Sequence, residues 1–318
     1  MNIALIQLGR IGDMILATPA FKIIKDKYPD SNLTVIAGRR NAVIPMNNPN
    51  VDKVLVYDKA PHKIIKFIMG LRKIKFDYYI DPKDHSSDES RIIAFLAKAK
   101  NKAGYSGQSP FNLKIDDHIS NVGVHYIDRY IKPLNIIDIT LPAKTPAPDL
   151  YENDSSREYV KEFLSNHNIT KFYVLNISAS HDRKMWSNEN WCEFVNKNDF
   201  DYPIILSYDP NDADRAEDLL TRTDKLIEFK SRNFFDVISL VKKAELLITP
   251  DTALVHIAAA FDVPLLGLFS GLDDFYAKFE PLSSVKEIIR AEKGDAGIHS
   301  IPVQDVDESF AKITARIE

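Results

Sequence analysis

Cysteine, long apolar runs and secretion signals are the main absences in this chain of 318 residues. Cys192 is the one cysteine, so an intrachain disulfide and a thiolate metal cluster are both excluded, as is typical of a reducing compartment. No stretch of about 18 apolar residues is present, which argues against a transmembrane helix. Residues 1–6 lack the cationic start of a signal peptide and have the pattern of a strand. We therefore expect a soluble, cytoplasmic protein.

Several ligand fingerprints are missing as well. The chain has neither G-x-G-x-x-G nor a P-loop, so neither NAD binding nor ATP hydrolysis is indicated. No second histidine stands at a suitable spacing from His256, so we expect no metal, and we expect no other cofactor. The basic residues are not interleaved with an aromatic platform, which argues against a nucleic acid partner.

What the chain does have is an ordinary globular composition with an uneven charge distribution. Its residues are 45% hydrophobic and 27% charged, and its length suffices for two domains. The net charge of −4 divides into +7 over residues 1–150 and −11 over the remainder. This asymmetry indicates a first half that faces an anionic partner, unless the charges are scattered by chance.

Short β-branched runs alternate with longer helical patterns in both halves, which predicts an α/β fold with two parallel, doubly wound sheets. The first helix is expected over Ile15–Tyr28, with Pro19 near its first turn. A proline-rich stretch around residues 141–156 is the expected linker, and we place the domains at 1–147 and 148–318. The expected strands are Asn2–Leu8, Asn32–Ala37, Lys53–Tyr57, Phe76–Ile80, Phe172–Ile177, Pro203–Ser207, Leu246–Thr249 and Leu265–Phe269.

Three segments that could carry binding or catalytic residues follow expected strands. Open parallel sheets bind ligands at the carboxyl ends of their strands, where these segments lie. The first contains Gly9, Gly12 and Asp13, whose carboxylate is either a helix N-cap or a general base for an acceptor hydroxyl. In the second, 178–191, hydroxyls and cations can coordinate phosphate oxygens, while its two tryptophans are interpreted as packing residues. In the third, 249–260, Pro250 ends a strand and a helix begins about Thr252, which offers an anion site.

A fourth segment, Lys59–Lys75, carries six cations and no acid, interspersed with apolar residues. It is either a basic amphipathic helix that rests on anionic lipid or binds acceptor phosphates, or an ordinary helix with one solvated face.

Together these segments resemble the heptosyltransferases, the ninth family of glycosyltransferases, which build the inner core of lipopolysaccharide. Leu8–Asp13 with Thr18-Pro19, the Lys184-Met185-Trp186 run, and Asp251-Thr252 followed by His256 carry the resemblance. It implies a GT-B fold, in which two Rossmann-like domains face a central cleft, and inverting transfer without a metal. It further implies that the first domain binds the acceptor and the second the nucleotide sugar.

The resemblance also assigns roles to single residues. Asp13 and Lys184 are expected to be catalytic, with Asp13 as the base and Lys184 stabilising the leaving diphosphate. Acceptor binding is expected from cations of the basic segment, namely Lys59, Lys63, Lys66 and Arg72. Donor binding is expected from the second domain, at Ser178, Ser180, Lys184, Glu228, Asp251, Thr252, Ala253 and His256.

The implied reaction moves heptose from ADP-heptose onto a phosphorylated, lipid-linked saccharide. The resemblance also implies a peripheral protein at the cytoplasmic face of the inner membrane. The chain departs from the family at Ala253, where glycine is usual, and at 270–274, where the family usually reads Gly-Pro-Thr-Asp-Pro. Two alternatives remain open: a nucleotide-sugar epimerase or hydrolase on the same architecture, and a nucleotide-binding protein without activity.

Overall fold

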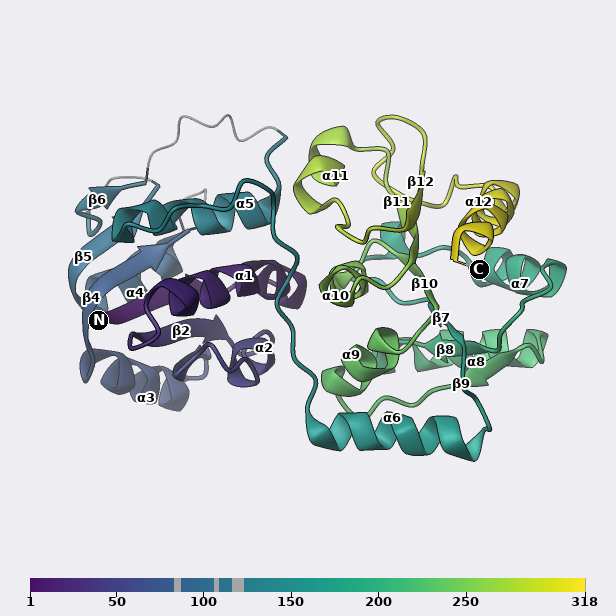
Figure 1. The fold of residues 1–318 in the computed structure, drawn as a ribbon, viewed down its shortest axis with the longest axis horizontal. Helices are drawn as coiled ribbons and strands as arrows, with labels where there is room; N and C mark the ends of the chain where they lie inside the picture. The colour runs from purple at the N-terminus through teal and green to yellow at the C-terminus, as the bar shows by residue number, and fades with distance from the viewer. Residues whose placement is uncertain (83–86, 106–108, 116–122, 318) are drawn as a thin grey trace. The chain divides into compact units, whose positions relative to one another are not determined.

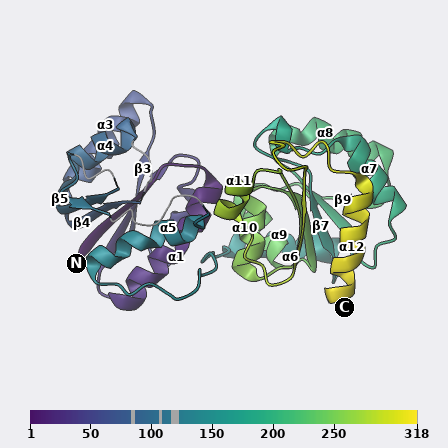
Figure 2. The same cartoon turned by 90° about the horizontal axis from the view of Figure 1, so that it is seen from above.

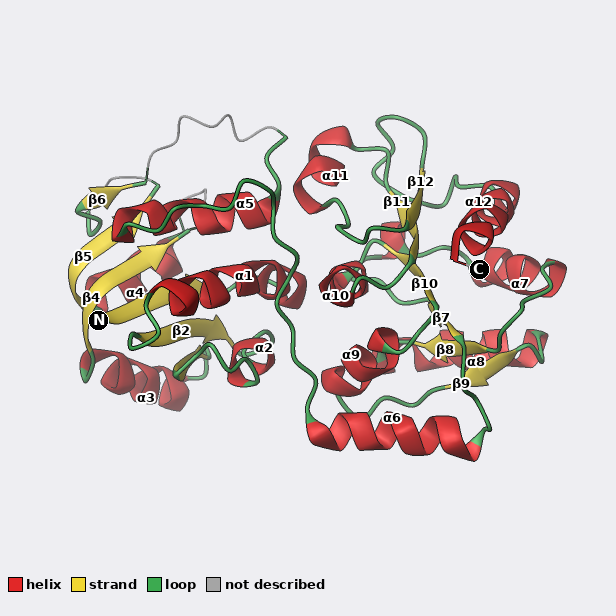
Figure 3. Ribbon diagram, viewed as in Figure 1, coloured by secondary structure: helices red, strands yellow, loops and turns green. Residues whose placement is uncertain are grey.

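The computed structural model describes residues 1–82, 87–105, 109–115 and 123–317. The chain divides into two compact units, Met1–Tyr151 and Glu152–Glu318, so the unit boundary falls slightly after the expected one at 147/148. Within each unit, helices cover both faces of a parallel, six-stranded sheet (Figures 1 and 3). The predicted α/β class with two doubly wound sheets is therefore confirmed.

The sheet of the first unit has the strand order β3-β2-β1-β4-β5-β6, and every pair is parallel. Helices α1 and α5 pack together on one face, whereas α3 and α4 share an apolar core on the other (Figure 2). Its elements are β1 (Asn2–Gln7), α1 (Ile11–Lys27), β2 (Asn32–Gly38), α2 (Val43–Met46), β3 (Lys53–Tyr57), α3 (Pro61–Arg72), β4 (Lys75–Asp81), α4 (Asp88–Leu96), β5 (Lys98–Gly104), β6 (Leu113–Lys114), α5 (Tyr126–Ile131) and the 3₁₀ helix η1 (Lys132–Ile137).

Helix α1 begins earlier than the sequence pattern predicted, at Ile11 instead of Ile15, so the position expected for Pro19 was wrong. Pro19 lies well inside the helix, where it cannot supply the N–H that normally bonds to the Ile15 carbonyl. The Thr18 hydroxyl donates to that carbonyl instead, at 2.7 Å. Thr18 Oγ1 also accepts the N–H of Asp149, which ties the segment before the unit boundary to α1.

The second unit repeats this architecture with the strand order β12-β11-β10-β7-β8-β9, again with parallel pairs. Its core includes Trp186 and Trp191, both fully buried with their rings edge to face, which confirms that the tryptophans are packing residues. Its elements are α6 (Asp154–Asn166), β7 (Tyr173–Asn176), η2 (Asp182–Lys184), α7 (Asn188–Lys197), β8 (Ile204–Ser207), η3 (Pro210–Asp212), α8 (Ala213–Arg222), β9 (Leu226–Glu228), α9 (Phe234–Lys242), β10 (Leu246–Pro250), α10 (Ala253–Phe261), β11 (Leu265–Phe269), α11 (Asp273–Phe279), β12 (Lys286–Arg290) and α12 (Val303–Ile317).

Each sheet has a point at which the direction of strand addition reverses. In the first unit it lies between β1 and β4, and in the second between β7 and β10. Loops that follow neighbouring parallel strands at such a point form a crevice that commonly binds ligands. The segments after β1, β4, β7 and β10 are therefore the first places to look for a site. In the described part of the chain, no helix is long and apolar enough to cross a membrane.

Candidate functional site

The turn between β1 and α1 holds Asp13 in a defined position. The N-cap of α1 is Arg10, and Asp13 is the third helical residue. Its Oδ2 accepts the Arg10 N–H at 2.8 Å, so Asp13 caps the helix from inside the first turn and is not itself the N-cap. A negative charge in the first turn is also favoured by the helix dipole. The carboxylate thus has a structural role at the start of α1.

Gly9 makes room for that carboxylate. A Cβ at this position would lie 2.4 Å from Asp13 Oδ2 and 2.8 Å from Gln7 Oε1. Gln7 Oε1 accepts the Gly9 N–H at 2.8 Å, and Asn41 Nδ2 donates to the carbonyl oxygens of Gln7 and Gly9. Gly9 is therefore required by close packing, and the turn is fixed from two sides.

A half-buried tyrosine and a second carboxylate lie at the same edge of the first sheet. Gln7 Nε2 donates to the Tyr126 hydroxyl at 2.9 Å. Burial, with the nearby Asp13 charge second, raises the pKa of the Tyr126 phenol. Asp81 ends β4, the neighbour of β1, and its carboxylate accepts the hydroxyl of Ser90. The first unit thus gathers two acids and a protonated phenol at its switch point.

In the second unit a lysine from the segment after β7 meets an aspartate from the segment after β10. Lys184 Nζ lies 2.5 Å from Asp251 Oδ2, and both side chains are buried. The ammonium also lies 4.5 Å from the centre of the Phe275 ring, a cation–π distance. An ammonium has three N–H donors, so the bond to Asp251 leaves it the capacity to bind an anion. Sequence reasoning predicted both residues for one ligand, and the structure brings them together.

The start of α10 lies directly after Asp251. Thr252 is its N-cap and accepts the Leu254 N–H through Oγ1 at 3.2 Å. Beneath it, Asn176 Nδ2 bridges β7 and β10 by donating to Thr249 Oγ1 at 2.9 Å. The helix dipole and the first N–H groups of α10, including that of Ala253, favour an anion at this position. A cation and a helix N-terminus therefore stand at the switch point of the second sheet.

The predicted serines of the second unit differ in their surroundings. Ser178 is buried, and its Oγ accepts the Asp209 N–H at 2.8 Å, so this hydroxyl holds the loop after β8. Ser180 is exposed in the loop before η2. Ser187 accepts the Asn190 N–H at 3.1 Å and is the N-cap of α7.

Glu228 ends β9 and is held by two neighbours. The Tyr208 hydroxyl donates to its Oε1 at 2.5 Å, and Lys230 Nζ lies 3.2 Å from its Oε2. Burial and the bond to Glu228 raise the pKa of Tyr208 to about 12. The carboxylate is partly exposed at the carboxyl end of its strand, where it can accept hydroxyl groups of a ligand.

The remaining predicted residues of this unit lie on or near α10. His256 is buried one turn into the helix, with its ring 6.5 Å from that of Phe279. In segment 270–274, where the chain departs from the family, close packing explains the glycine at position 271. A Cβ on Gly271 would lie 1.8 Å from the Glu292 carbonyl oxygen. Asp273 pairs with Arg290 at 2.8 Å. This loop is thus tied to the segment that follows β12.

The predicted basic segment folds as α3 with its flanks. Lys59 pairs with the Glu89 carboxylate at 2.5 Å, and Lys63 pairs with the Asp58 carboxylate at 2.8 Å. Lys66 and Arg72 are exposed on the helix. The four predicted acceptor cations therefore share one helix region, and Lys59 and Lys63 pair with different carboxylates.

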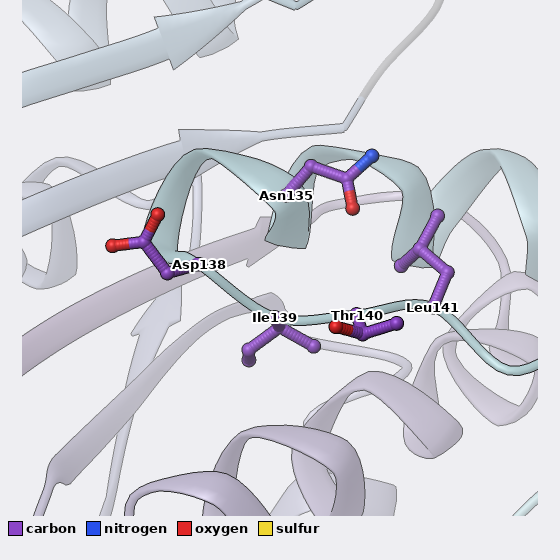
Figure 4. A pocket seen from close by; sticks show the side chains of 5 residues that line it. All are labelled: Asn135, Asp138, Ile139, Thr140 and Leu141. Carbon is purple, nitrogen blue, oxygen red and sulfur yellow. The ribbon is translucent and has the colours of Figure 1, made fainter.

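The first unit also has a surface hollow at the end of η1. This hollow contains neither the residues around Asp13 nor the cations of the basic segment. It is lined by Asn135, Asp138, Ile139, Thr140 and Leu141 (Figure 4). The Asn135 amide and the Asp138 carboxylate point in opposite directions, whereas ligand sites have convergent polar groups. The described residues contain no group of three or more His, Cys, Asp or Glu side chains placed to hold a metal ion.

Sequence reasoning missed several of the supporting side chains. Gln7 and Asn176 end strands, a position that marks candidates in any parallel sheet, so that signal was present. Tyr126 and Phe275 carry no comparable signal, because each reaches its partner from a distant part of the chain.

Comparison with known sequences identifies similar proteins of one kind. The model of glycosyltransferase family 9 (heptosyltransferase) matches residues 64–298, which include the Lys184–Asp251 pair but not Asp13. The lipopolysaccharide core heptosyltransferase OpsX of Haemophilus influenzae is 22% identical over 85% of this chain and 79% of its own length. Lipopolysaccharide heptosyltransferase 3 of Escherichia coli is 24% identical over 83% of this chain and 81% of its own.

Solved structures extend the likeness over both units. A family 9 glycosyltransferase from Veillonella parvula has a TM-score of 0.83 at 18% identity and covers 99% of this chain and 97% of its own. The E. coli heptosyltransferase WaaC with ADP has a TM-score of 0.76 at 17% identity, covering 98% and 99%. A UDP-GlcNAc 2-epimerase from Methanocaldococcus jannaschii reaches 0.53 at 14%, covering 98% and 92%. The fold is thus that of the GT-B heptosyltransferases, and the epimerase resembles it less.

Proposed function

Because the chain belongs to glycosyltransferase family 9, we propose that this glycosyltransferase moves heptose from ADP-heptose onto a lipopolysaccharide inner-core or related surface-glycan acceptor. The observation that carries the proposal is the buried Lys184–Asp251 pair beside the N-terminus of α10. Growing negative charge on a leaving diphosphate needs fixed cations and N–H donors of this kind. Two relatives named for lipopolysaccharide heptose transfer support the choice of sugar and acceptor.

The proposed donor site uses the residues predicted from the sequence. Lys184 and the N–H groups at Thr252 and Ala253 bind the diphosphate, and Asp251 holds the Lys184 ammonium in place. Glu228 accepts the ribose hydroxyls. Further donor contacts are assigned to Ser178, Ser180 and His256. ADP as the nucleotide is supported by the similar fold of WaaC, whose structure contains ADP.

In the proposed reaction, Asp13 removes the proton of an acceptor hydroxyl as that oxygen attacks the anomeric carbon. The bond from this carbon to the diphosphate oxygen breaks at the same time, so the configuration inverts and ADP leaves with the bonding electrons. Asp13 is suited to this role because its carboxylate is fixed by the Arg10 N–H and by the close approach of Gly9. The mechanism needs no metal, since Lys184 and α10 supply the positive charge.

Acceptor binding is assigned to the first unit. The cations Lys59, Lys63, Lys66 and Arg72 attract a phosphorylated, lipid-linked saccharide, in keeping with the net charge of +7 over residues 1–150. We place the protein at the cytoplasmic face of the inner membrane, as a peripheral protein.

A panel of ADP-, UDP-, GDP- and CDP-sugars tests the donor assignment. A donor that binds only the native state raises the melting temperature of the protein, and we expect ADP-heptose to do so. In a transfer assay, heptose should appear on lipopolysaccharide from a heptose-deficient strain. Release of free or epimerised sugar from the donor alone favours the hydrolase or epimerase alternative. Donor binding with no product across the acceptor panel favours an inactive nucleotide-binding protein.

A further inference from the structure

Large apolar side chains are exposed on two neighbouring helices of the first unit. Ile65 and Met69 of α3 are 62% and 57% exposed, and Ile92 and Phe95 of α4 are 58% and 72% exposed. Side chains of this size are normally buried, and a group of them on one surface marks an interaction site. These four residues define the α3–α4 surface.

The two pairs lie on one layer. Helices α3 and α4 bury Phe67, Leu71 and Ile93 in the same core against the sheet, so the side chains that point away from that core lie on its outer side. Ile65 and Met69 stand four apart on α3, which places them on one face of the helix.

The heights of the helices also match. Lys75 and Lys98, which start the strands after α3 and α4, are register partners in the sheet. Met69 precedes Lys75 by as many residues as Ile92 precedes Lys98, so these two side chains start from similar heights along the sheet. Figure 2 draws α3 and α4 side by side, and they are in contact.

Cations outnumber acids around this surface. On α3 the exposed residues Lys63 and Lys66 precede and interleave with the apolar pair, and Arg72 and Lys73 follow it. The strand starts add further cations at the same edge of the sheet, namely Lys75, Lys98 and Lys100. The acids at the start of α4 are Asp88, which is exposed one turn before Ile92, and Glu89, which pairs with Lys59.

We infer that the α3–α4 surface docks on an anionic lipid bilayer, inserting Ile65, Met69, Ile92 and Phe95 while the surrounding cations contact headgroups. Apolar side chains ringed by Lys and Arg fit the interfacial region, where acyl chains lie beneath negative headgroups. The inference adds a defined surface to the peripheral location in the proposed function, and it rests on that function for the membrane concerned. Docking there brings the first unit to the surface that carries a lipid-linked acceptor.

Vesicle binding without acceptor tests the inference directly. The full chain is expected to sediment with vesicles of equal parts phosphatidylglycerol and phosphatidylcholine, and not with phosphatidylcholine alone. Binding should weaken steeply with salt, since each cation near an anionic surface contributes roughly fivefold. The double variants Ile65→Ser/Met69→Ser and Ile92→Ser/Phe95→Ser should each bind at least about tenfold more weakly.

The chain offers a matched control in Met46, which is 61% exposed on α2, away from this surface. Met46→Ser should bind vesicles as the wild type does. In a Phe95→Trp variant, the new fluorescence should shift to the blue with anionic vesicles, against a background from the fully buried Trp186 and Trp191.

Three results would overturn the inference: unchanged binding by both double variants, no shift for Phe95→Trp, or a wild-type dimer that the double variants convert to a monomer. The last would make the surface an interface between copies of this chain.

A failure of the donor assignment can be told apart from a failure of this inference, because the proposed donor site is in the other unit. ADP should still raise the melting temperature of the double variants, whereas Lys184→Met should lose that effect and keep vesicle binding.

Discussion

Replacing Gly9 with alanine should damage turnover far more than stability. The new Cβ would stand 2.4 Å from Asp13 Oδ2, whereas ordinary contact begins at 3.4 Å, so the carboxylate has to move by about 1 Å. Gln7 Oε1, at 2.8 Å from the same Cβ, must also shift. Both atoms are ends of flexible side chains, and Gly9 does not have a positive φ, so the backbone can stay in place.

The magnitude follows from what Asp13 does at this position. Moving the carboxylate weakens its 2.8 Å bond to the Arg10 N–H, and losing such a cap costs about 1 kcal/mol of unfolding free energy. A displacement of about 1 Å in a catalytic group can lower the rate by about 10²-fold, and a general base contributes about 10²–10⁴-fold in total. We expect kcat to fall by about 10²-fold while the affinity for ADP, whose proposed site lies in the other unit, is unchanged.

The assay combines initial rates of heptose transfer with calorimetric titration of ADP and thermal unfolding. Gly70→Ala is the matched control, because its Cβ would meet only Leu55 Cδ2, at 3.5 Å, inside helix α3. This control should keep its turnover and gain about 0.5–1 kcal/mol of stability. A folded Gly9→Ala protein with the kcat of the wild type would refute the reasoning.

Three further predictions concern the second unit. Gly271→Ala should lower the melting temperature sharply, because its Cβ would meet the backbone oxygen of Glu292 at 1.8 Å and overpacking costs about 1–3 kcal/mol; a melt that matches the wild type contradicts this. Lys184→Met should lower kcat by about 10²–10³-fold and weaken ADP binding in a titration, and unchanged ADP affinity would remove Lys184 from the diphosphate site. Burial raises the pKa of Asp236, but hydrogen bonds from Arg232 outweigh it and hold that pKa below its ordinary value. Its stabilisation is therefore present above about pH 4 and lost as the pH falls, so Asp236→Asn should flatten the acid side of the stability profile, measured by denaturant unfolding.

Most of the fold could be predicted from hydrophobic patterns, and the failures have physical reasons. Strands such as β2 and β10 are buried on both faces, so they stand out as apolar runs. Strand β5 reads Lys-Ala-Lys-Asn-Lys-Ala-Gly and was missed, because its pairing with β4 and not its own hydrophobicity makes it a strand. The start of α1 was placed too late because Pro19 was taken as a first-turn residue.

The site was predictable where it depends on the order of strands and loops. Lys184 and Asp251 each follow a strand, and β7 and β10 are neighbours, so parallel topology brings them together. The surroundings of Asp13 were harder to predict, because the nearby Gln7–Tyr126 bond spans 119 residues and no local pattern encodes it. The role proposed for the exposed residues Ile92 and Phe95 could not be predicted from the sequence, because it depends on α3 and α4 packing on one face of the sheet.

The most direct test of the proposed chemistry is the Asp13→Asn variant, which keeps the size of the side chain and an oxygen that can accept the Arg10 N–H but removes the base. With ADP-heptose and a heptose-deficient lipopolysaccharide acceptor, kcat should fall by at least about 10²-fold, while the dissociation constant for ADP stays within about twofold of the wild-type value. Turnover close to that of the wild type would contradict the assignment of Asp13 as the base.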